Sequence, residues 1–559
     1  MKQLKKVLTI LLVLALAFSL TPVSGQAAAK KVKLNKTKVT LNIGKKLQLK
    51  VKNLKKGQKV TWKSSKQRVA AVSKKGKVTA KKVGTAKITA KVGKKKYSCK
   101  VTVKKKVTKQ TAKPTATKSP SSNPTTTAPA STSAPTYNIG NKNKSDVAAL
   151  QKIIKEQKDL GANVSENLDA TIKYTWDSGE GEQVEIIEEY QWNEEGRLVG
   201  IVWDGRKLKG NISFSSLTAL TTLECDRNEL NGLDVSGCAA LMELYCHSNQ
   251  LSNLDISGCS ALTELDCSVN QLSSLDISNH TALTTLECYG NQISDLEVSK
   301  STALTKLHCT NNKLNSLDVS KNMALTDLRC GGNQLSSLDV SKNMALAELD
   351  CGGNQLGSLD VSNHAALVSL KCEGGGLSSL NVSGCTALDS LECATHFWTN
   401  RYPNELSSLD VSSCKALTNL HCCGNKLSSL DVSGCTTLTN LQCHDNQLTG
   451  LDISKNTVLE YLDCEHNQLS SLDVSKNTAL TGLSCAYNQL TGLDISKNIV
   501  LEHLECSHNQ LSSLDVSENT ALTMLNCDFN QLSSLDVSNC KALESLRCDS
   551  TVAVVGYPK

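Results

Sequence analysis

Histidine, carboxylate and tyrosine side chains recur between Leu220 and Cys548, and residues of these types perform hydrolysis or bind metals in many proteins. They flank a pattern, Leu-x-x-Leu-x-Cys, that occurs sixteen times, almost always at a spacing of 21 residues. The histidines do not fall at a fixed ligand spacing, and the sequence has no Ser-His-Asp arrangement, Gly-rich phosphate loop or His-Glu-x-x-His element. We therefore interpret these side chains as the solvated face of a repeat, and we predict no enzymatic activity, no cofactor and no metal site.

The 24 cysteines are candidates for disulfides, metal ligands or buried apolar side chains. Sixteen occupy one position of the repeat, and six share another: Cys238, Cys259, Cys385, Cys414, Cys435 and Cys540. Adjacent coils place Cβ atoms about 5 Å apart, farther than the roughly 3.8 Å of a disulfide, so we favour a buried thiol core over a disulfide ladder. A few disulfides among the six stay open as an alternative. Labelling of the thiols should be slow except at Cys423 and Cys99, which lie outside both sets.

The pattern defines a coil of 21 residues, exemplified by the segment from Leu262 to Ala282, LTELDCSVNQLSSLDISNHTA. The chain is expected to turn at Asn270, and the inward positions are Leu262, Leu265, Cys267, Leu272, Leu275 and Ile277. A fixed period of this size is typical of solenoids. Over about three fifths of the chain the pattern resembles the bacterial leucine-rich repeat, in particular the short repeats of the IRREKO and internalin type.

Each repeat has two similar halves. The first half has Leu, Leu, Cys and Asn at relative positions 0, 3, 5 and 8. The second half repeats this spacing, with Leu at 10 and 13, Val or Ile at 15, and Asn or Cys at 18. The resemblance to IRREKO repeats implies a short strand in both halves, with β-structure on the convex side. Coils stacked about 4.8 Å apart would form a rod of roughly 75 Å with an extended open face. Such a face favours a large partner.

Two polar columns are assigned structural roles. An Asp at position 14 recurs thirteen times, from Asp234 to Asp536, and should face outward; we favour a hydrogen-bonded turn there over a cation-binding stripe. The Asn at position 8 is expected to satisfy backbone groups at each turn and to build a ladder between coils. This structural ladder consists of Asn228, Asn249, Asn270, Asn291, Asn312, Asn333, Asn354, Asn425, Asn446, Asn467, Asn488, Asn509 and Asn530.

One insertion, assigned to residues 394–404, interrupts the period. After Cys393 the sequence ATHFWTNRYPNEL adds eight residues, so the next pattern begins at Leu417, 29 residues after Leu388. Its aromatic and Arg side chains are of the kind that dominates interface energies. The alternative is that the loop covers the preceding coil, where the three glycines at 374–376 provide no side chains. The partner-binding candidates in the insertion and on the open face are Phe397, Trp398, Arg401, Tyr402, Tyr461, His466 and Tyr487.

The formal net charge of +9 combines two opposed blocks. Residues 1–137 contain 35 Lys and Arg and no Asp or Glu, whereas the rest of the chain contains 27 basic and 53 acidic residues.

Short alternating runs separated by glycine predict a small β-sandwich early in the chain. The string VTWKSSKQRVAAVSKKGKVTAKKVGTAKITA resembles the bacterial immunoglobulin-like group 2 domain, although Lys fills most polar positions. This module should hold anionic cell-wall polymer; nucleic acid is not expected, since the module is exported and offers only Trp62 and Tyr97 for stacking.

The remaining segments complete the domain organisation. Residues 1–29 have the basic, apolar and small-residue regions of a secretory signal peptide, and no transmembrane segment is expected in the mature chain. The immunoglobulin-like domain is assigned to 30–105, a Thr/Ser/Pro-rich linker to 106–137, an N-terminal cap with a degenerate first repeat to 138–219, the repeats to 220–548 and a tail to 549–559. In the cap we predict a helix over 145–160 with Ser145 as N-cap and Gly161 as terminator, and strands around 172–176 and 185–192.

The predicted fold class is thus multidomain: a small all-β immunoglobulin-like sandwich, then a β-rich right-handed leucine-rich-repeat solenoid with an α/β N-terminal cap. These features favour a secreted bacterial recognition protein, whose basic domain is expected to associate with the cell wall and whose solenoid is expected to bind an extracellular protein or glycan. The alternative is a structural component of an extracellular matrix or surface layer without a discrete ligand.

Overall fold

The computed structural model describes residues 141–177, 182–395 and 403–557, and residues 33–104 apart from 35–37, 43–44, 54–59, 65, 68, 83 and 93–94. The chain divides into two compact units, residues 1–132 and 133–559. The predicted signal peptide and linker lie outside the described residues, as do residues 396–402 of the insertion.

The first unit is a small β-sandwich, as the alternating sequence predicts. One sheet has the strand order β2-β9-β8-β5, a second has the order β3-β7-β6, and β1 pairs with β4. Leu49, Val78, Ile88 and Val101 form part of its buried core. The strands are β1 (Lys33–Leu34), β2 (Lys38–Asn42), β3 (Lys46–Gln48), β4 (Val51–Lys52), β5 (Val60–Ser64), β6 (Ala70–Val72), β7 (Lys77–Ala80), β8 (Gly84–Val92) and β9 (Lys95–Lys104).

The second unit begins with a helix, α2 (Lys144–Asp159), which buries Val147, Leu150, Ile153 and Ile154. Its N-cap is Asn143, whose side chain accepts hydrogen bonds from the Ser145 and Asp146 amides at 3.0 and 3.2 Å. The prediction of Ser145 as N-cap is therefore wrong, because the Asn side chain two residues earlier already satisfies these amides. Gly161 follows the helix with φ 91°, a left-handed conformation that suits glycine.

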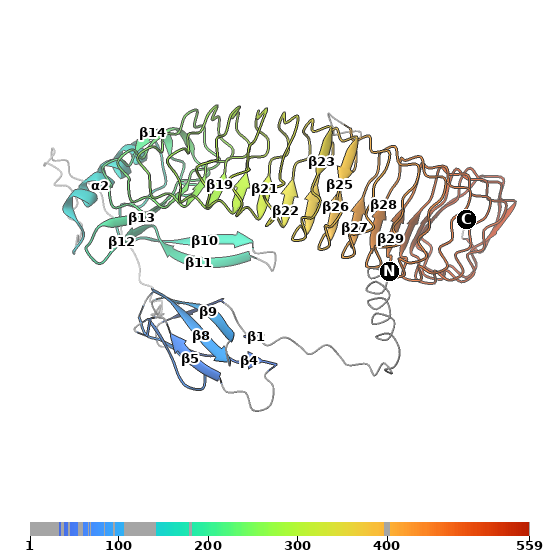
Figure 1. Cartoon of the computed structure of the whole chain (residues 1–559), viewed down its shortest axis with the longest axis horizontal. Helices are drawn as coiled ribbons and strands as arrows, with labels where there is room; N and C mark the ends of the chain where they lie inside the picture. The colour runs from blue at the N-terminus through green and yellow to red at the C-terminus, as the bar shows by residue number, and fades with distance from the viewer. Residues whose placement is uncertain are drawn as a thin grey trace, which may run out of the picture. The chain divides into compact units, whose positions relative to one another are not determined.

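The cap continues as two separate β-structures. Strands β10 (Thr171–Asp177) and β11 (Glu182–Glu188) form their own antiparallel sheet (Figure 1). Strand β12 (Tyr190–Trp192) instead pairs with β13 (Leu198–Val202), so the predicted strand over 185–192 is divided between two sheets. The rings of Tyr190 and Trp203 meet edge to face with centroids 6.0 Å apart, and both side chains are buried under the first coil.

One sheet of eighteen strands runs through the described coils and lines the inner side of their arc (Figure 1). Its strands are parallel from β13 onward, and each central Leu pairs with the central Leu of the next coil, as Leu265 does with Leu286. After β12 and β13 the strands are β15 (Thr222–Glu224), β17 (Glu243–Tyr245), β18 (Glu264–Asp266), β19 (Thr285–Glu287), β20 (Lys306–His308), β21 (Asp327–Arg329), β22 (Glu348–Asp350), β24 (Ser369–Lys371), β26 (Ser390–Glu392), β27 (Asn419–His421), β28 (Asn440–Gln442), β29 (Tyr461–Asp463), β30 (Gly482–Ser484), β31 (His503–Glu505), β32 (Met524–Asn526) and β34 (Ser545–Arg547).

The opposite side of the coils contains less regular strand than the two-half pattern predicts. Its described strands form three pairs: β14 (Lys209–Ser213) with β16 (Glu229–Asp234), β23 (Ser358–Asp360) with β25 (Ser379–Asn381), and β33 (Ser534–Asp536) with β35 (Ala553–Val555). In coils with and without these strands the outward Asp accepts the amide two residues later: Asp431 Oδ1 accepts the Ser433 amide, and Asp360 Oδ1, at the end of β23, accepts the Ser362 amide, both at 2.8 Å. These local bonds support a hydrogen-bonded turn for the Asp column.

The core of the solenoid is a continuous stack of Leu, Val, Ile and Cys side chains. All 24 cysteines have free thiols, and burial raises the pKa of those in the inward file, to about 12 for Cys309. Cys99 and Cys423 are also buried, so the expectation of fast labelling at these two thiols is wrong. Cys548, in the last coil, is the one thiol that is only partly buried.

Two columns of buried polar side chains hold the turns. At the turn after each main-sheet strand, an Asn side chain bonds in both directions: Asn467 Oδ1 accepts the Leu448 amide at 2.9 Å, and its Nδ2 donates to the carbonyls of Cys443 and Cys464, both at 3.1 Å. We call this the first turn. At the second turn, relative position 18, Asn477 Nδ2 donates to the Ile453 carbonyl at 3.0 Å.

The second turn accepts several residue types for one hydrogen-bonding task. The thiol of Cys259 donates to the Val235 carbonyl at 3.4 Å, and His280 Nε2 lies 3.1 Å from the Ile256 carbonyl. Asn477 makes the equivalent bond to a carbonyl 24 residues earlier in the chain. The six cysteines at this position therefore act as hydrogen-bond donors within the turn, and they are not paired in disulfides.

Candidate functional site

The open face of the eighteen-stranded sheet extends along the solenoid. In each three-residue strand the central Leu points into the core, and the two flanking side chains point outward and are wholly or partly exposed in most coils. Equivalent residues of successive coils therefore form columns along the solenoid axis. The chemistry of these columns changes from one end to the other.

Carboxylates dominate the first coils of this face. Asp226 is nearly buried, and desolvation raises its pKa to about 8, although its Oδ1 accepts the His247 amide at 2.8 Å. The Tyr245 hydroxyl donates to Glu264 at 2.6 Å. Further along, His308 Nε2 lies 2.8 Å from Asp327 Oδ2. These polar groups are mostly engaged with one another.

Aromatic side chains characterise the last coils. The ring of Tyr461 lies beside Gly482 of the next strand, because a Cβ at Gly482 would lie 2.7 Å from Tyr461 Cδ2 and 3.0 Å from its Cε2. The glycine therefore leaves room for the ring, and the Tyr461 side chain is 37% exposed. His503 and Met524 continue the same column on β31 and β32, since Gly482 pairs with His503 and His503 with Met524.

Four rings stack at the first turn of these coils. His466, Tyr487, His508 and Phe529 have successive centroid separations of 4.1, 4.0 and 4.2 Å and interplanar angles of 11–14°. His466 and Tyr487 are partner-binding candidates from the sequence, whereas His508 and Phe529 were not predicted. In four successive coils the residue immediately before the ladder Asn is aromatic. Comparison of this one repeat position across the sequence would have identified all four rings.

This ring column adopts an unfavourable backbone conformation. The four residues have φ between 49° and 55°, a left-handed region in which a side chain costs roughly 1–2 kcal/mol per residue. Earlier coils place Gly290, Gly332, Gly353 and Gly424 at the same position with φ of 62–67°, and others place Arg, Ser, Val, Asn or Asp there with φ of 51–54°. Stacking between the rings offsets part of the cost.

The insertion candidates Phe397, Trp398, Arg401 and Tyr402 lie outside the described residues. The described end of the insertion supplies a ladder residue that the repeat pattern missed. Asn404 Oδ1 accepts the Leu377 amide at 2.9 Å, and its Nδ2 donates to the carbonyls of Cys372 and Cys393 at 3.0 Å. The first-turn column is therefore maintained across the insertion.

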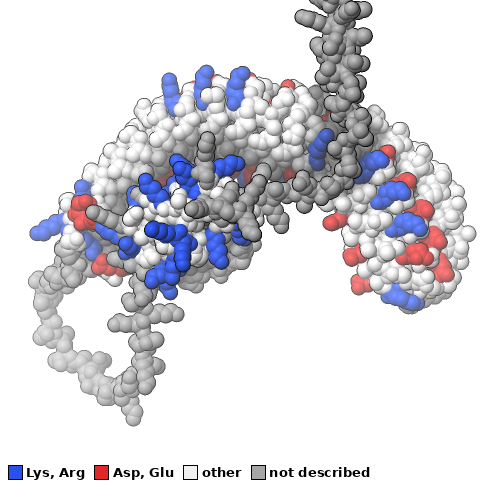
Figure 2. Space-filling view, turned by 60° about the horizontal axis from the view of Figure 1, so that its bottom comes forward, with Lys and Arg blue, Asp and Glu red and all other residues white. Residues whose placement is uncertain are grey.

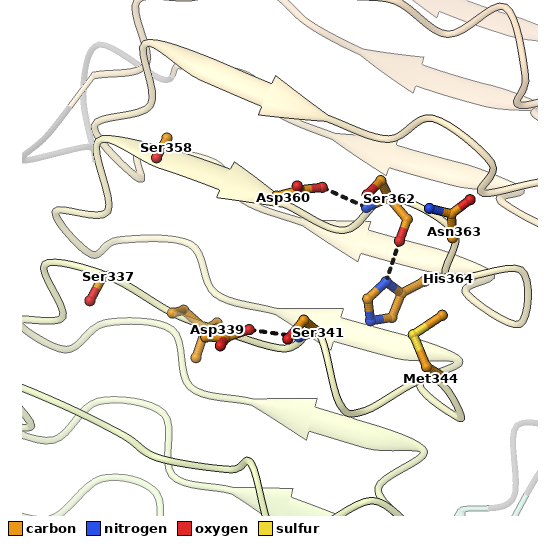
Figure 3. A pocket seen from close by; sticks show the side chains of 10 residues that line it. Ser337, Asp339, Ser341, Met344, Ser358, Asp360, Ser362, Asn363 and His364 are labelled. Carbon is orange, nitrogen blue, oxygen red and sulfur yellow. Dashed lines mark hydrogen bonds between the residues drawn. The ribbon is translucent and has the colours of Figure 1, made fainter.

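Two further features contribute no separate site. A hollow of about 530 Å³ on the second-turn side is lined by Asp339 and Asp360, but each carboxylate accepts a hydrogen bond at 2.8 Å from the Ser amide of its own turn (Figure 3). His444 Nδ1 lies 2.9 Å from Asp463 Oδ2, and hydrogen bonding to Asp463, ahead of Cys423, raises the pKa of His444 to about 10. Among the described residues no three His, Cys, Asp or Glu side chains are placed to hold a metal ion.

The first unit offers a different surface. Its described strands carry exposed Lys side chains such as Lys63, Lys77 and Lys91, and Lys and Arg crowd the visible face of this unit in Figure 2. On the C-terminal coils, basic and acidic side chains instead lie in neighbouring rows (Figure 2). No described helix in either unit is long and apolar enough to cross a bilayer.

Known proteins resemble both units. Residues 28–103 match the family described as bacterial Ig-like domain (group 2). The functional domain of InlJ from Listeria monocytogenes, which is described as including a cysteine ladder, is 34% identical with a TM-score of 0.45; the match covers 56% of this chain and 64% of that one. No curated protein matches the sequence.

Two other solved structures are similar at lower identity. A leucine-rich-repeat protein of Leptospira interrogans is 24% identical with a TM-score of 0.50, over 60% of this chain and 90% of that one. A plant peptide hormone receptor, solved in complex with a peptide, is 22% identical with a TM-score of 0.55, over 64% of each chain. These two similarities concern the fold alone. The present chain spans about 64% of the length of the InlJ domain that it matches.

Proposed function

We propose that this bacterial leucine-rich-repeat protein, with its group 2 immunoglobulin-like domain, is a secreted or cell-surface recognition protein without enzymatic activity. The observation that carries the proposal is the open face of the eighteen-stranded sheet, whose outward side chains form continuous columns. Solenoids use such extended surfaces to bind large partners. The partner would be an extracellular protein or glycan, bound by the aromatic side chains of the last coils and by the insertion.

The basic domain would associate with anionic cell-wall polymers. Residues 30–106 contain 29 basic and no acidic residues, so attraction to a polyanion is not opposed within this segment. Retention of the full chain on purified wall material should fall steeply as salt is raised. A chain that is not retained at low ionic strength would refute this part of the proposal.

Affinity capture with the full chain tests recognition by the solenoid. A saturable extracellular partner should be recovered, and replacing Trp398, Arg401 and Tyr402 together with Ala should weaken its binding by several kcal/mol while the unfolding midpoint barely changes. Equal losses of stability and affinity would instead mean that the insertion covers a coil. Self-assembly without any saturable partner would favour the alternative, a structural component of an extracellular layer.

A further inference from the structure

The last coils combine two aromatic features that the fold does not require. The ring column places four aromatic side chains in a row at a left-handed position that earlier coils fill with Gly, Arg, Ser, Val, Asn or Asp, and the Tyr461 ring lies beside Gly482, which leaves room for it. Phe529 is 61% exposed, Tyr487 is 44% exposed and Met524 is 44% exposed. This much apolar surface in water is unfavourable for a protein that has no partner there. It indicates a binding surface.

We infer that the aromatic surface of the last coils, formed by Tyr461, Met524 and the ring column, binds an uncharged glycan chain that runs parallel to the solenoid axis. The inference rests on the proposed function, because it names the ligand class of the same open face. Its first support is the exposed side of Tyr461. The C–H groups on one side of a pyranose ring are apolar and pack against exposed aromatic rings.

Polar groups accompany the rings along the same coils. The column beside Tyr461 consists of Asp463, Ser484, Glu505 and Asn526, which follow one another in register. Asn526 Nδ2 donates to Glu505 Oε2 at 2.8 Å, which orients the carboxylate on the open face. Carboxylate, amide and hydroxyl groups are the hydrogen-bond partners that sugar hydroxyls need. The surface thus offers apolar and polar contacts at every coil.

The spacing of these contacts favours a repeating chain. Strands of successive coils are about 4.8 Å apart and the ring centroids 4.0–4.2 Å apart, whereas an extended peptide advances by only about 3.3–3.4 Å per residue and so falls out of step. A pyranose unit advances a glycan by about the length of one sugar ring, which is comparable with the coil spacing. The negative charges of Asp463, Glu465 and Glu505 disfavour an anionic polymer, so the expected glycan is uncharged.

Calorimetric titration of the full chain tests the inference. The probes are linear cello-, xylo-, manno-, laminari- and N-acetylchito-oligosaccharides of two to eight units. At least one series should bind, its affinity should rise with length up to about four or five units and then level off, and added salt should have little effect. If no series binds, or if affinity is independent of length, the inference is wrong.

Variants locate the site. Gly482→Ala places a methyl group where Tyr461 lies and should reduce affinity several-fold, and Tyr461→Ala combined with Tyr487→Gly should reduce it at least tenfold. Glycine suits the left-handed backbone at Tyr487, so folding should be preserved, which circular dichroism and the unfolding midpoint will show. Asn311→Gly, at the same position of a coil without rings, is the matched control and should bind as the unaltered chain does.

The outcomes separate this inference from the proposed function. If an extracellular protein binds the open face while no oligosaccharide does, recognition by the solenoid stands and the glycan inference fails. If a glycan binds but Gly482→Ala and the double variant bind it equally well, the ligand lies elsewhere and the aromatic surface is not the site.

Discussion

The two turns of each coil are both held by buried polar side chains, yet only one of them tolerates a change of residue. At the first turn the side chain must accept one amide and donate to two carbonyls, as Asn467 does. Asn alone combines these roles at the required size. At the second turn only carbonyls need a partner, so Asn, Cys and His are interchangeable. The number of backbone groups served thus decides how strictly a repeat position is fixed.

Unused atoms support this comparison. The Oδ1 atoms of six second-turn Asn side chains accept no hydrogen bond from the protein, although they are buried: those of Asn322, Asn343, Asn456, Asn477, Asn498 and Asn519. Where the first-turn Asn is replaced by Gly375, the lost acceptor is supplied otherwise, because the Gly375 carbonyl accepts the Leu356 amide at 2.9 Å. The side chain at the first turn must therefore both accept and donate hydrogen bonds, whereas the side chain at the second turn needs only to donate.

The largest effect should come from removing a first-turn Asn. Asn467→Ala leaves the Leu448 amide buried without this acceptor, at about 1–3 kcal/mol, and removes one of the two Asn donors from each of the Cys443 and Cys464 carbonyls, which keep Asn446 and Asn488. We expect a loss of about 2–3 kcal/mol in urea unfolding. Asn467→Cys should be nearly as costly, because a thiol cannot replace the acceptor. A loss below about 1 kcal/mol would contradict the comparison.

A second-turn Asn in the same coil should matter less. Asn477→Ala removes donors to the Ile453 and Asn456 carbonyls, at 3.0 and 2.9 Å, but it also removes an unsatisfied Oδ1. The expected cost is about 1–2 kcal/mol. Asn477→Cys keeps a donor and should cost less than Asn477→Ala. Equal costs for the two replacements would show that the donor is irrelevant at this turn.

Serine should distinguish the two sets of cysteines. Cys351 is fully buried in the inward file, so Cys351→Ser should cost about 1–3 kcal/mol by burying a hydroxyl among apolar side chains, and Cys351→Ala should cost less. Cys259→Ser should cost under about 1 kcal/mol, because the hydroxyl can donate to the Val235 carbonyl as the thiol does. The measurement is denaturant unfolding of both variants. The reverse order would mean that these thiols do not differ in their hydrogen bonding.

The smallest effect should be a local response to acid at the second-turn side. Hydrogen bonds from Ser213, followed by Ser236, lower the pKa of Asp234 to about 2. A lowered carboxylate pKa stabilises the folded state above the unfolded value near 4, and this contribution is lost as pH falls through 2. Amide exchange at Ser236 should therefore accelerate in this window. Exchange at Leu448, whose partner Asn467 does not titrate, should lack this acid-induced change, and Asp234→Asn should abolish the response at Ser236.

The coil architecture could be predicted because every coil repeats the same apolar positions, and the fold class is confirmed. Other features depend on contacts that one repeat does not reveal. The strands expected in the second half are limited to three described pairs, and the Asp turn does not decide where they form, because it occurs both at Asp360 in β23 and at Asp431 in a coil without such a strand. The N-cap is Asn143 and not Ser145, because the Asn143 side chain accepts a hydrogen bond from the Ser145 amide.

The aromatic surface could be predicted only in part. Tyr461, His466 and Tyr487 are recognisable as exposed aromatic residues, but stacking depends on neighbouring coils holding their turns in the same left-handed conformation. The space for the Tyr461 ring arises from Gly482, 21 residues further along the chain. Such relations appear only when the repeats are compared column by column.

The position of Asn404 has a consequence for altering this protein. It reaches the Leu377 amide and the Cys372 carbonyl just as other first-turn Asn residues reach theirs, although eight extra residues precede it. Coil geometry is therefore insensitive to the length of chain between the inward Cys and the turn Asn. Foreign peptides spliced at this point in chosen coils would leave the stack in register. The distances between the inserted peptides would then be multiples of the inter-strand spacing of about 4.8 Å, so the solenoid would fix their separation.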